Sequence, residues 1–206
     1  MDSAAWDARY SATELVWSAG PNRWVEAELA GLQPGRAIDL GAGEARNSIW
    51  LAGKGWTVTA ADFSTVALSK GRRAAGQFDD GRTDRISWLD ADLTCYVPEP
   101  GSFDLALLAY LQLPAGQRAT IVRRAAAALA AGGVLLVVGH DLTNLTDGTG
   151  GPQDASVLFT PQDVVGDLAT SGVTLRIEKA ERLLRPVPGA DRPAVDALVR
   201  AVALGE

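Results

Sequence analysis

Short apolar segments alternate with segments of helical periodicity along most of the 206-residue chain. The apolar segments, rich in Val, Ile, Leu and Ala, predict strands at about 36–40, 57–61, 85–90, 103–108, 134–138 and 173–182. The segments between them predict a helix capped by Ser64 and further helices at about 21–32, 46–54, 115–131 and 161–170. This alternation is typical of βαβ units and a parallel sheet. The periodicity of 194–203 fits a helix or a strand, and the order of elements favours a final strand.

Proline and glycine set the expected ends of several elements. Pro21 is expected in the first turn of the helix at 21–32, and the helix at 115–131 is expected to stop at Gly132 and Gly133. Segment 140–158 is rich in glycine and has no clear periodicity. We therefore expect a long loop there that is either functional or mobile.

Composition and charge narrow the class of protein. A hydrophobic fraction of 47% is normal for a globular chain, and 206 residues suit one α/β domain. The net charge of −6, with basic residues clustered only on predicted helices, argues against a nucleic-acid partner. No apolar run is long enough to cross a membrane, and residues 1–7 lack a signal-peptide pattern, so we expect a cytoplasmic protein. The single cysteine, Cys95, excludes an internal disulfide and a cysteine-based zinc site.

The strongest local signal is the sequence DLGAGEA at 39–45, at the exit of the first predicted strand. Gly41 permits a tight turn, and Gly43 lets a ligand approach the backbone closely. Ala45 is small enough for close packing of the next helix against the strand. Several classes of nucleotide-binding protein share this spacing, and a simple strand-to-helix turn produces it too.

Carboxylates follow the next two predicted strands. Asp62 lies about 20 residues after the glycine turn, where a carboxylate can accept both hydroxyls of a ribose. Phe63 beside it can lie along an adenine ring, whereas a helix-capping Asp62 and a core Phe63 are the alternatives. Asp92 can accept from the adenine amine while Leu93 offers its backbone amide. The carboxyl ends of parallel strands meet at one edge of a sheet, so these groups are expected close together.

These motifs resemble the class I S-adenosylmethionine-dependent methyltransferases. The segment DLGAGEARN at 39–47 looks most like the small-molecule branch near the tellurite-resistance methyltransferases. The segments that match the rest of the family pattern are WDARY at 6–10, Pro21-Asn22, FDLALL at 103–108, Leu113-Pro114 and AGGVLL at 131–136. The resemblance covers nearly the whole chain. It implies a single α/β domain over 1–206, a Rossmann-like three-layer sandwich whose seven-stranded sheet is mostly parallel with an antiparallel C-terminal strand.

The resemblance also implies S-adenosylmethionine as cofactor and S-adenosylhomocysteine as product. Asp39 would position the cofactor's amino group, the glycine turn would lie under its methionine part, and Asp62 would bind its ribose. The segment 1–32 would cover the cofactor, with Arg9 and Trp17 closing over it; alternatively, Trp17 is a core residue and Arg9 a surface charge. The residues expected to bind the cofactor are Trp17, Asp39, Gly41, Ala42, Gly43, Asn47, Asp62, Phe63, Ser64, Asp92, Leu93, Leu108, Ala109 and Tyr110. Ala45 replaces the family's usual glycine, a tolerated change.

The sequence defines the residues that bind the methyl acceptor less clearly than those that bind the cofactor. AYLQ at 109–112 replaces the Asn-Pro-Pro-aromatic or Asp-Pro-Pro-aromatic motif, which counts against methylation of DNA bases or glutamine. The single histidine, His140, can take a proton from an acceptor with Asp141 orienting its ring; alternatively, it caps a strand or bonds a loop carbonyl. Tyr110 and Gln112 are candidates to line the acceptor pocket. The loop at 144–152 suits either a lid over that pocket or an ordinary surface loop.

The predicted function is methyl transfer from S-adenosylmethionine to a small-molecule acceptor, at oxygen, sulfur or another heteroatom. A noncatalytic S-adenosylmethionine-binding protein is one alternative. An NAD(P)-dependent reductase is the other, although the sequence shows neither a Tyr-x-x-x-Lys motif nor a separate substrate domain. No metal site is predicted, and the pattern does not indicate an oligomeric state.

Overall fold

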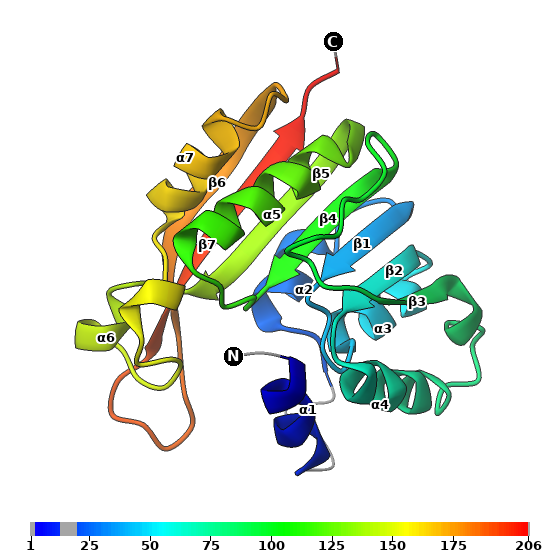
Figure 1. Ribbon diagram of the computed structural model, residues 1–206, viewed down its shortest axis with the longest axis horizontal. Helices are drawn as coiled ribbons and strands as arrows, with labels where there is room; N and C mark the ends of the chain where they lie inside the picture. The colour runs from blue at the N-terminus through cyan, green and yellow to red at the C-terminus, as the bar shows by residue number, and fades with distance from the viewer. Residues whose placement is uncertain (1–2, 13–19, 206) are drawn as a thin grey trace. The chain divides into compact units, whose positions relative to one another are not determined.

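In the computed structural model, which describes residues 3–12 and 20–205, the chain divides into two compact units. Met1–Val97 forms the first unit and Pro98–Glu206 the second (Figure 1). Three strands belong to the first unit and four to the second, so both take part in the expected α/β fold. None of the helices in the described ranges combines the length and apolar character needed to cross a membrane.

The first unit contains parallel strands in the order β3-β2-β1. These strands are β1 (Arg36–Leu40), β2 (Thr57–Asp62) and β3 (Ile86–Asp90). The helices of this unit are α1 (Ser3–Ser11), α2 (Arg23–Leu29), α3 (Arg46–Gly53), α4 (Thr65–Ala75) and the 3-10 turn η1 (Thr83–Arg85). Ile38, Leu40 and Val58 are fully buried, because parallel strands are normally covered on both faces.

Two helix starts in the first unit depend on side-chain caps. The predicted cap at Ser64 is confirmed, since its hydroxyl accepts from the backbone N–H of Ala67 at 3.1 Å. The prediction that Pro21 lies in the first turn of a helix is wrong. Asn22 is the N-cap, and its side-chain oxygen accepts from the N–H of Trp24 at 2.9 Å. The capping bond fixes the start of α2 at Arg23, after the proline.

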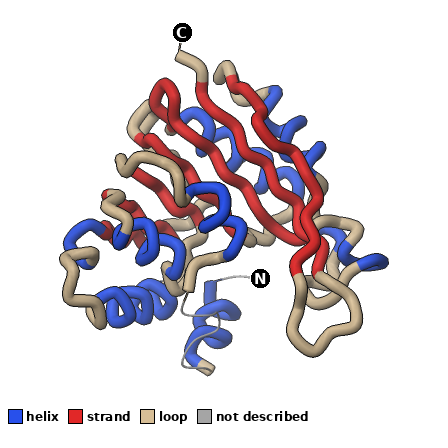
Figure 2. Tube along the Cα trace, turned by 180° about the vertical axis from the view of Figure 1, so that it is seen from behind, coloured by secondary structure: helices blue, strands red, loops and turns tan. Residues whose placement is uncertain are grey.

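The second unit contains four strands in the order β4-β5-β7-β6. These strands are β4 (Phe103–Ala109), β5 (Leu129–His140), β6 (Leu175–Arg185) and β7 (Ala194–Ala203). β7 is antiparallel to both of its neighbours, which confirms the predicted final strand. The helices are α5 (Ala115–Ala127), α6 (Asn144–Asp147), α7 (Pro161–Ala169) and the 3-10 turn η2 (Ala155–Val157). α5 and α7 cover one face of these strands (Figure 1), and Figure 2 shows the strands from the opposite side.

The predicted helix at 115–131 is too long. α5 ends at Ala127, and β5 begins at Leu129, which pairs with Phe103 of β4. The carbonyl of Ala128 accepts from the backbone N–H groups of Ser102 and Phe103 at 2.9 and 3.0 Å. Pairing with β4 therefore overrides the helix propensity of the alanines, and Gly132 lies within β5 instead of ending the helix.

The segment at 140–158 is more structured than the expected loop, because it contains α6 and η2. Asn144 organises it from a buried position. Its side-chain oxygen accepts from the N–H of Val195 at 2.7 Å, and its amide nitrogen donates to the carbonyl of Gly150 at 2.8 Å. One side chain thus ties the segment to the start of β7.

Candidate functional site

The glycine turn follows β1 and precedes α3. Gly41 has a φ of 79°, a left-handed conformation that favours glycine. The N–H groups of Gly41 and Ala42 both donate to the carbonyl of Ala61, at 2.9 and 3.0 Å, which fixes the turn against β2. Ala45 adopts a φ of 59° at the N-cap of α3 and is fully buried. The alanine therefore takes on a backbone strain of roughly 1 kcal/mol that glycine avoids.

Helix α1 covers the second glycine of this turn. A Cβ atom added to Gly43 would lie 2.7 Å from the hydroxyl oxygen of Tyr10, so only glycine fits there without displacement. Tyr10 is 5% exposed. Lys70 of α4, which lies beside α1 in Figure 1, donates to the carbonyl of Tyr10 at 2.7 Å and forms an ion pair with Glu44 at 2.8 Å. These contacts anchor α1 over the turn.

Asp39 is the carboxylate of the first unit with the most unusual surroundings. It is 1% exposed, and its Oδ2 accepts from the Ser48 hydroxyl at 2.7 Å. Its Oδ1 is buried without a hydrogen-bond partner among the described residues. Burial, together with the nearby charge of Asp62, raises the pKa of Asp39 to about 6 despite the bond from Ser48. A buried carboxylate with an unused oxygen is suited to receive a cationic group.

Asp62 stabilises the glycine turn through hydrogen bonds and also lies beside it. Its two oxygens accept from the backbone N–H groups of Gly43 and Ser64, each at 2.8 Å. Burial raises the pKa of Asp62, and these two bonds oppose that rise. Each carboxylate oxygen has a second lone pair, so Asp62 retains the capacity to accept ribose hydroxyls. Ser64 also donates its hydroxyl to Asp7 of α1, and Phe63 is half-buried.

The remaining cofactor candidates of this unit differ in their surroundings. Asp92 is exposed, and its Oδ1 accepts from the backbone and hydroxyl of Thr94 at 2.8 and 2.7 Å, which lowers its pKa. Leu93 is 5% exposed. Asn47 is buried, and its side-chain oxygen accepts from the N–H of Asn22, a structural bond that the sequence did not indicate. Trp17 lies outside the described residues.

Tyr110 and His140 meet in the second unit. Leu108 and Ala109 end β4, and Tyr110 follows with a φ of 58°, a left-handed conformation rare for a bulky residue. Its ring lies edge-on to that of His140, with the centroids 5.0 Å apart. Gln112 follows in a half-buried position. Backbone strain of this kind is concentrated at functional sites.

The expected pairing of His140 with Asp141 is wrong. Asp141 is fully buried, and its carboxylate accepts from the backbone and hydroxyl of Thr143 and from Nε of Arg182, the last at 3.1 Å to both oxygens. Consecutive residues along an extended strand point to opposite faces, which directs the two side chains apart. The carboxylate beside His140 belongs to Asp196, its direct partner in the pairing of β5 with β7.

Asp196 and Arg185 are site candidates that sequence reasoning missed. Asp196 is a lone carboxylate inside the otherwise largely apolar segment 194–203, and this isolation was the available signal. Its side chain is fully buried and forms an ion pair with Nε of Arg185 at 2.7 Å. Which residue lies opposite Asp196 depends on the strand register, which the sequence does not reveal.

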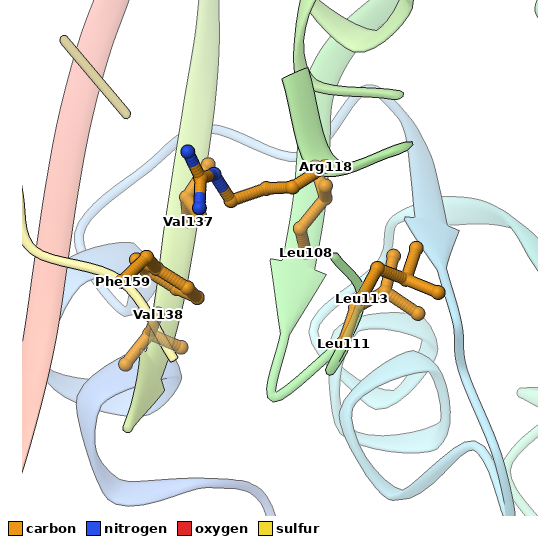
Figure 3. Close-up of a pocket in the computed structure, with 7 residues that line it drawn as sticks. All are labelled: Leu108, Leu111, Leu113, Arg118, Val137, Val138 and Phe159. Atoms are coloured by element: carbon orange, nitrogen blue, oxygen red, sulfur yellow. The ribbon is translucent and has the colours of Figure 1, made fainter. Parts of the chain in front are cut away.

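An apolar pocket opens beside β4 and β5 (Figure 3). It is lined by Leu108, Leu111, Leu113, Arg118, Val137, Val138 and Phe159. Arg118 forms an ion pair with Asp167 at 2.9 Å, and its guanidinium lies 5.5 Å from the centroid of the Phe159 ring. The cation of the pocket is therefore already paired, and the rest of its lining favours an apolar group.

Comparison with known proteins shows that part of the chain is similar to one family. Residues 37–133, a little under half of the chain, match a family model described as a methyltransferase domain. The demethylmenaquinone methyltransferase of Beutenbergia cavernae is 34% identical over 106 residues, which are 50% of this chain and 41% of that protein. The chain thus matches only about two fifths of the length of its curated relatives.

Solved structures share the fold over nearly the whole chain. A structure solved for the conversion of a disulfide bond into a thioacetal group during echinomycin biosynthesis gives a TM-score of 0.74 at 20% identity, covering 98% of this chain and 92% of the other. An S-adenosylmethionine-dependent methyltransferase from Methanosarcina mazei gives 0.69 at 18% identity, with 91% and 100% covered. These likenesses confirm the expected Rossmann-like α/β fold. The similarity of residues 37–133 to the methyltransferase model agrees with the expected enzyme class and S-adenosylmethionine cofactor.

Proposed function

We propose that this protein is an S-adenosylmethionine-dependent methyltransferase that acts on a small-molecule acceptor. The observation that carries the proposal is the unused oxygen of Asp39, buried within the segment that matches the methyltransferase family. Burying a carboxylate is costly unless a cation or donor compensates for it. The ammonium group of the methionine part of the cofactor supplies such a cation.

Different residues of the first unit bind different parts of the cofactor. Asp39 holds the amino group, and the turn of Gly41, Ala42 and Gly43 lies under the methionine part. Asp62 accepts the ribose hydroxyls with the lone pairs that its backbone bonds leave open. Helix α1, anchored through Tyr10, covers the cofactor.

Other residues of the first unit bind the adenine. Phe63, Leu93 and Asp92 bind the adenine. When bound, S-adenosylmethionine supplies an electrophilic methyl group on a sulfonium. The work of the protein is then to orient the acceptor and to exclude water, and neither task needs a metal.

The acceptor is a small molecule. The net charge of −6 disfavours a polyanion. The curated relative from Beutenbergia cavernae is named for a quinone, demethylmenaquinone, which is not a polyanion. Membership of the tellurite-resistance branch stays a prediction.

Calorimetric titration with S-adenosylmethionine and, separately, with NADH tests the proposal. We expect micromolar binding of S-adenosylmethionine alone, and at least tenfold weaker binding by Asp39→Asn. Asp80→Asn is the matched control, because Asp80 is an aspartate of the same unit that pairs with Arg82 at the surface. Binding of NADH instead, or of neither compound, would overturn the proposal. Binding without methyl transfer to any member of an acceptor library would leave a noncatalytic cofactor-binding protein.

A further inference from the structure

Three polar side chains from three other segments gather around His140. Asp196 of β7 lies opposite it in register, with Oδ1 3.5 Å from Nδ1 of the imidazole. Arg185 at the end of β6 donates to both oxygens of Asp196, at 2.7 and 3.3 Å. Tyr110 presents its ring to His140 on one side and lies 5.8 Å from the Arg185 guanidinium on the other. The arrangement is a closed cluster in which each member contacts at least two others.

The cluster is held rigidly. Asp196 is fully buried, and the His140 side chain is 11% exposed. A Cβ atom added to Gly151, whose φ is 73°, would lie 2.9 Å from Nδ1, Cε1 and Nε2 of His140, so this loop glycine packs directly against the ring. The left-handed backbone of Tyr110 adds strain that only a well-packed site maintains. Rigid support of this kind is what a proton-accepting side chain requires.

The two ring nitrogens of His140 differ in their surroundings. Nδ1 is buried, has no hydrogen-bond partner among the described residues, and lies 3.5 Å from Oδ1 of Asp196, the carboxylate beside it. A neutral imidazole carries one proton, and a carboxylate beside Nδ1 favours the tautomer with that proton on Nδ1. Nε2 then has a free lone pair. Asp196 and Arg185 are the charged groups that face the ring, Tyr110 is the other titratable group, and no others are found among the described residues.

The net charge environment keeps the ring neutral near pH 7. Burial lowers the pKa of His140, the carboxylate of Asp196 raises it, and Arg185 lowers it, with a net downward shift. Protonation of Nε2 creates an imidazolium. The negative charge of Asp196, whose Oδ1 lies 3.5 Å from Nδ1, stabilises this cation. In this arrangement His140 is the base and Asp196 is the carboxylate that orients it.

We propose that Asp196, held by Arg185, is the positioning residue that fixes the tautomer of His140 and leaves Nε2 to accept the proton of a hydroxyl or thiol acceptor. The inference rests on the proposed function and narrows its acceptor to compounds methylated at an acidic O–H or S–H group. In the proton transfer, the O–H or S–H bond breaks, the proton passes to Nε2, and the electron pair stays on oxygen or sulfur. The anion that results is the better nucleophile.

Nitrogen NMR of the free protein tests the positioning role directly. His140 is the only histidine of the chain, so 15N-histidine labelling gives one pair of ring signals without assignment. We expect a protonated Nδ1 and an unprotonated Nε2 in the wild type near pH 7.5. Asp196→Asn should lower the pKa of His140 and redistribute the tautomers, whereas Arg185→Gln should raise that pKa. Asp141→Asn is the control and should change neither property.

The NMR measurement distinguishes whether Asp196 positions His140. A wild-type ring protonated mainly on Nε2, or an Asp196→Asn ring with the wild-type tautomer and pKa, would overturn the positioning role. Removing Asp196 alone leaves Arg185 without its buried partner and can unfold the chain, so the double variant Asp196→Asn/Arg185→Gln provides a second measurement. We expect this variant to fold and to lose the Nδ1-protonated preference, and retention of that preference would also overturn the role.

Methyl transfer to catechol, thiophenol and benzylamine tests the acceptor class. We expect transfer to catechol or thiophenol, at least tenfold slower in Asp196→Asn, with the affinity for S-adenosylmethionine changed less than twofold. Transfer to benzylamine alone, or to none of the three by a protein that binds S-adenosylmethionine, would overturn the acceptor class. Failure to bind S-adenosylmethionine would instead overturn the proposed function, and the NMR result on the free protein would stand independently.

Discussion

Replacing Asp39 by asparagine should stabilise the unliganded protein at neutral pH while weakening its binding of cofactor. Burial raises the pKa of Asp39 from 3.8 to about 6. At 1.36 kcal/mol per pKa unit, this shift lowers the stability of the folded state relative to the unfolded chain by about 3 kcal/mol once the carboxylate is ionised. Asparagine keeps an oxygen for the Ser48 hydroxyl and carries no charge. A carboxylate that costs stability and is nevertheless present is expected where a ligand needs it.

The pH dependence isolates this cost from other effects of the substitution. The folded-state pKa lies above the unfolded one, so between these values the folded state binds more protons, and wild-type stability falls as pH rises. The contribution of Asp39 is therefore most favourable below about pH 4 and is lost as pH rises through about 6. The free energy of unfolding of Asp39→Asn minus that of the wild type should grow by about 3 kcal/mol over this window. Any constant effect of the asparagine amide cancels.

Urea unfolding followed by tryptophan fluorescence measures this difference at several pH values. Asp80→Asn is the control, because Arg82 lowers the pKa of the exposed Asp80 to about 2 and the difference should stay flat above about pH 5. A flat difference for Asp39→Asn across the same range would refute the argument from burial. In calorimetry, wild-type affinity for S-adenosylmethionine should fall as pH drops below about 6, because a protonated Asp39 no longer attracts the ammonium.

Three further substitutions test contacts around the site. Gly43→Ala places a Cβ 2.7 Å from the Tyr10 hydroxyl at a φ of 55° and should cost about 2 kcal/mol in urea unfolding. Adding Tyr10→Phe should recover part of this loss, and the absence of recovery would remove the clash as its cause. Asp62→Ala breaks two backbone bonds, so we expect a loss of about 2 kcal/mol and at least tenfold weaker cofactor binding by calorimetry; unchanged affinity would exclude the ribose role. Thr160→Ala removes the capping box of α7 and should lower the free energy of unfolding by about 1 kcal/mol. Its affinity for S-adenosylmethionine should stay at the wild-type value, and a tenfold change would contradict a purely local role.

The sequence alone determined the features that contiguous residues control. Hydrophobic periodicity located the strands of both units, the cap at Ser64 followed from its hydroxyl, and the glycine turn followed from its spacing. It also indicated that Asp39 and Asp62 end neighbouring strands. These features are short-range, because side-chain alternation, turn conformation and helix capping each depend on a few adjacent residues.

Only the tertiary structure decided which distant residues meet. Ala128 ends a helix because its carbonyl pairs with the start of β4, although its neighbours favour a longer helix. His140 faces Asp196 and not the adjacent Asp141, because the register of β5 with β7 places Asp196 opposite it. The alternation of side chains along a strand turns Asp141 the other way, toward Arg182. Strand register is set by packing between segments far apart in the chain, so no local pattern encodes it.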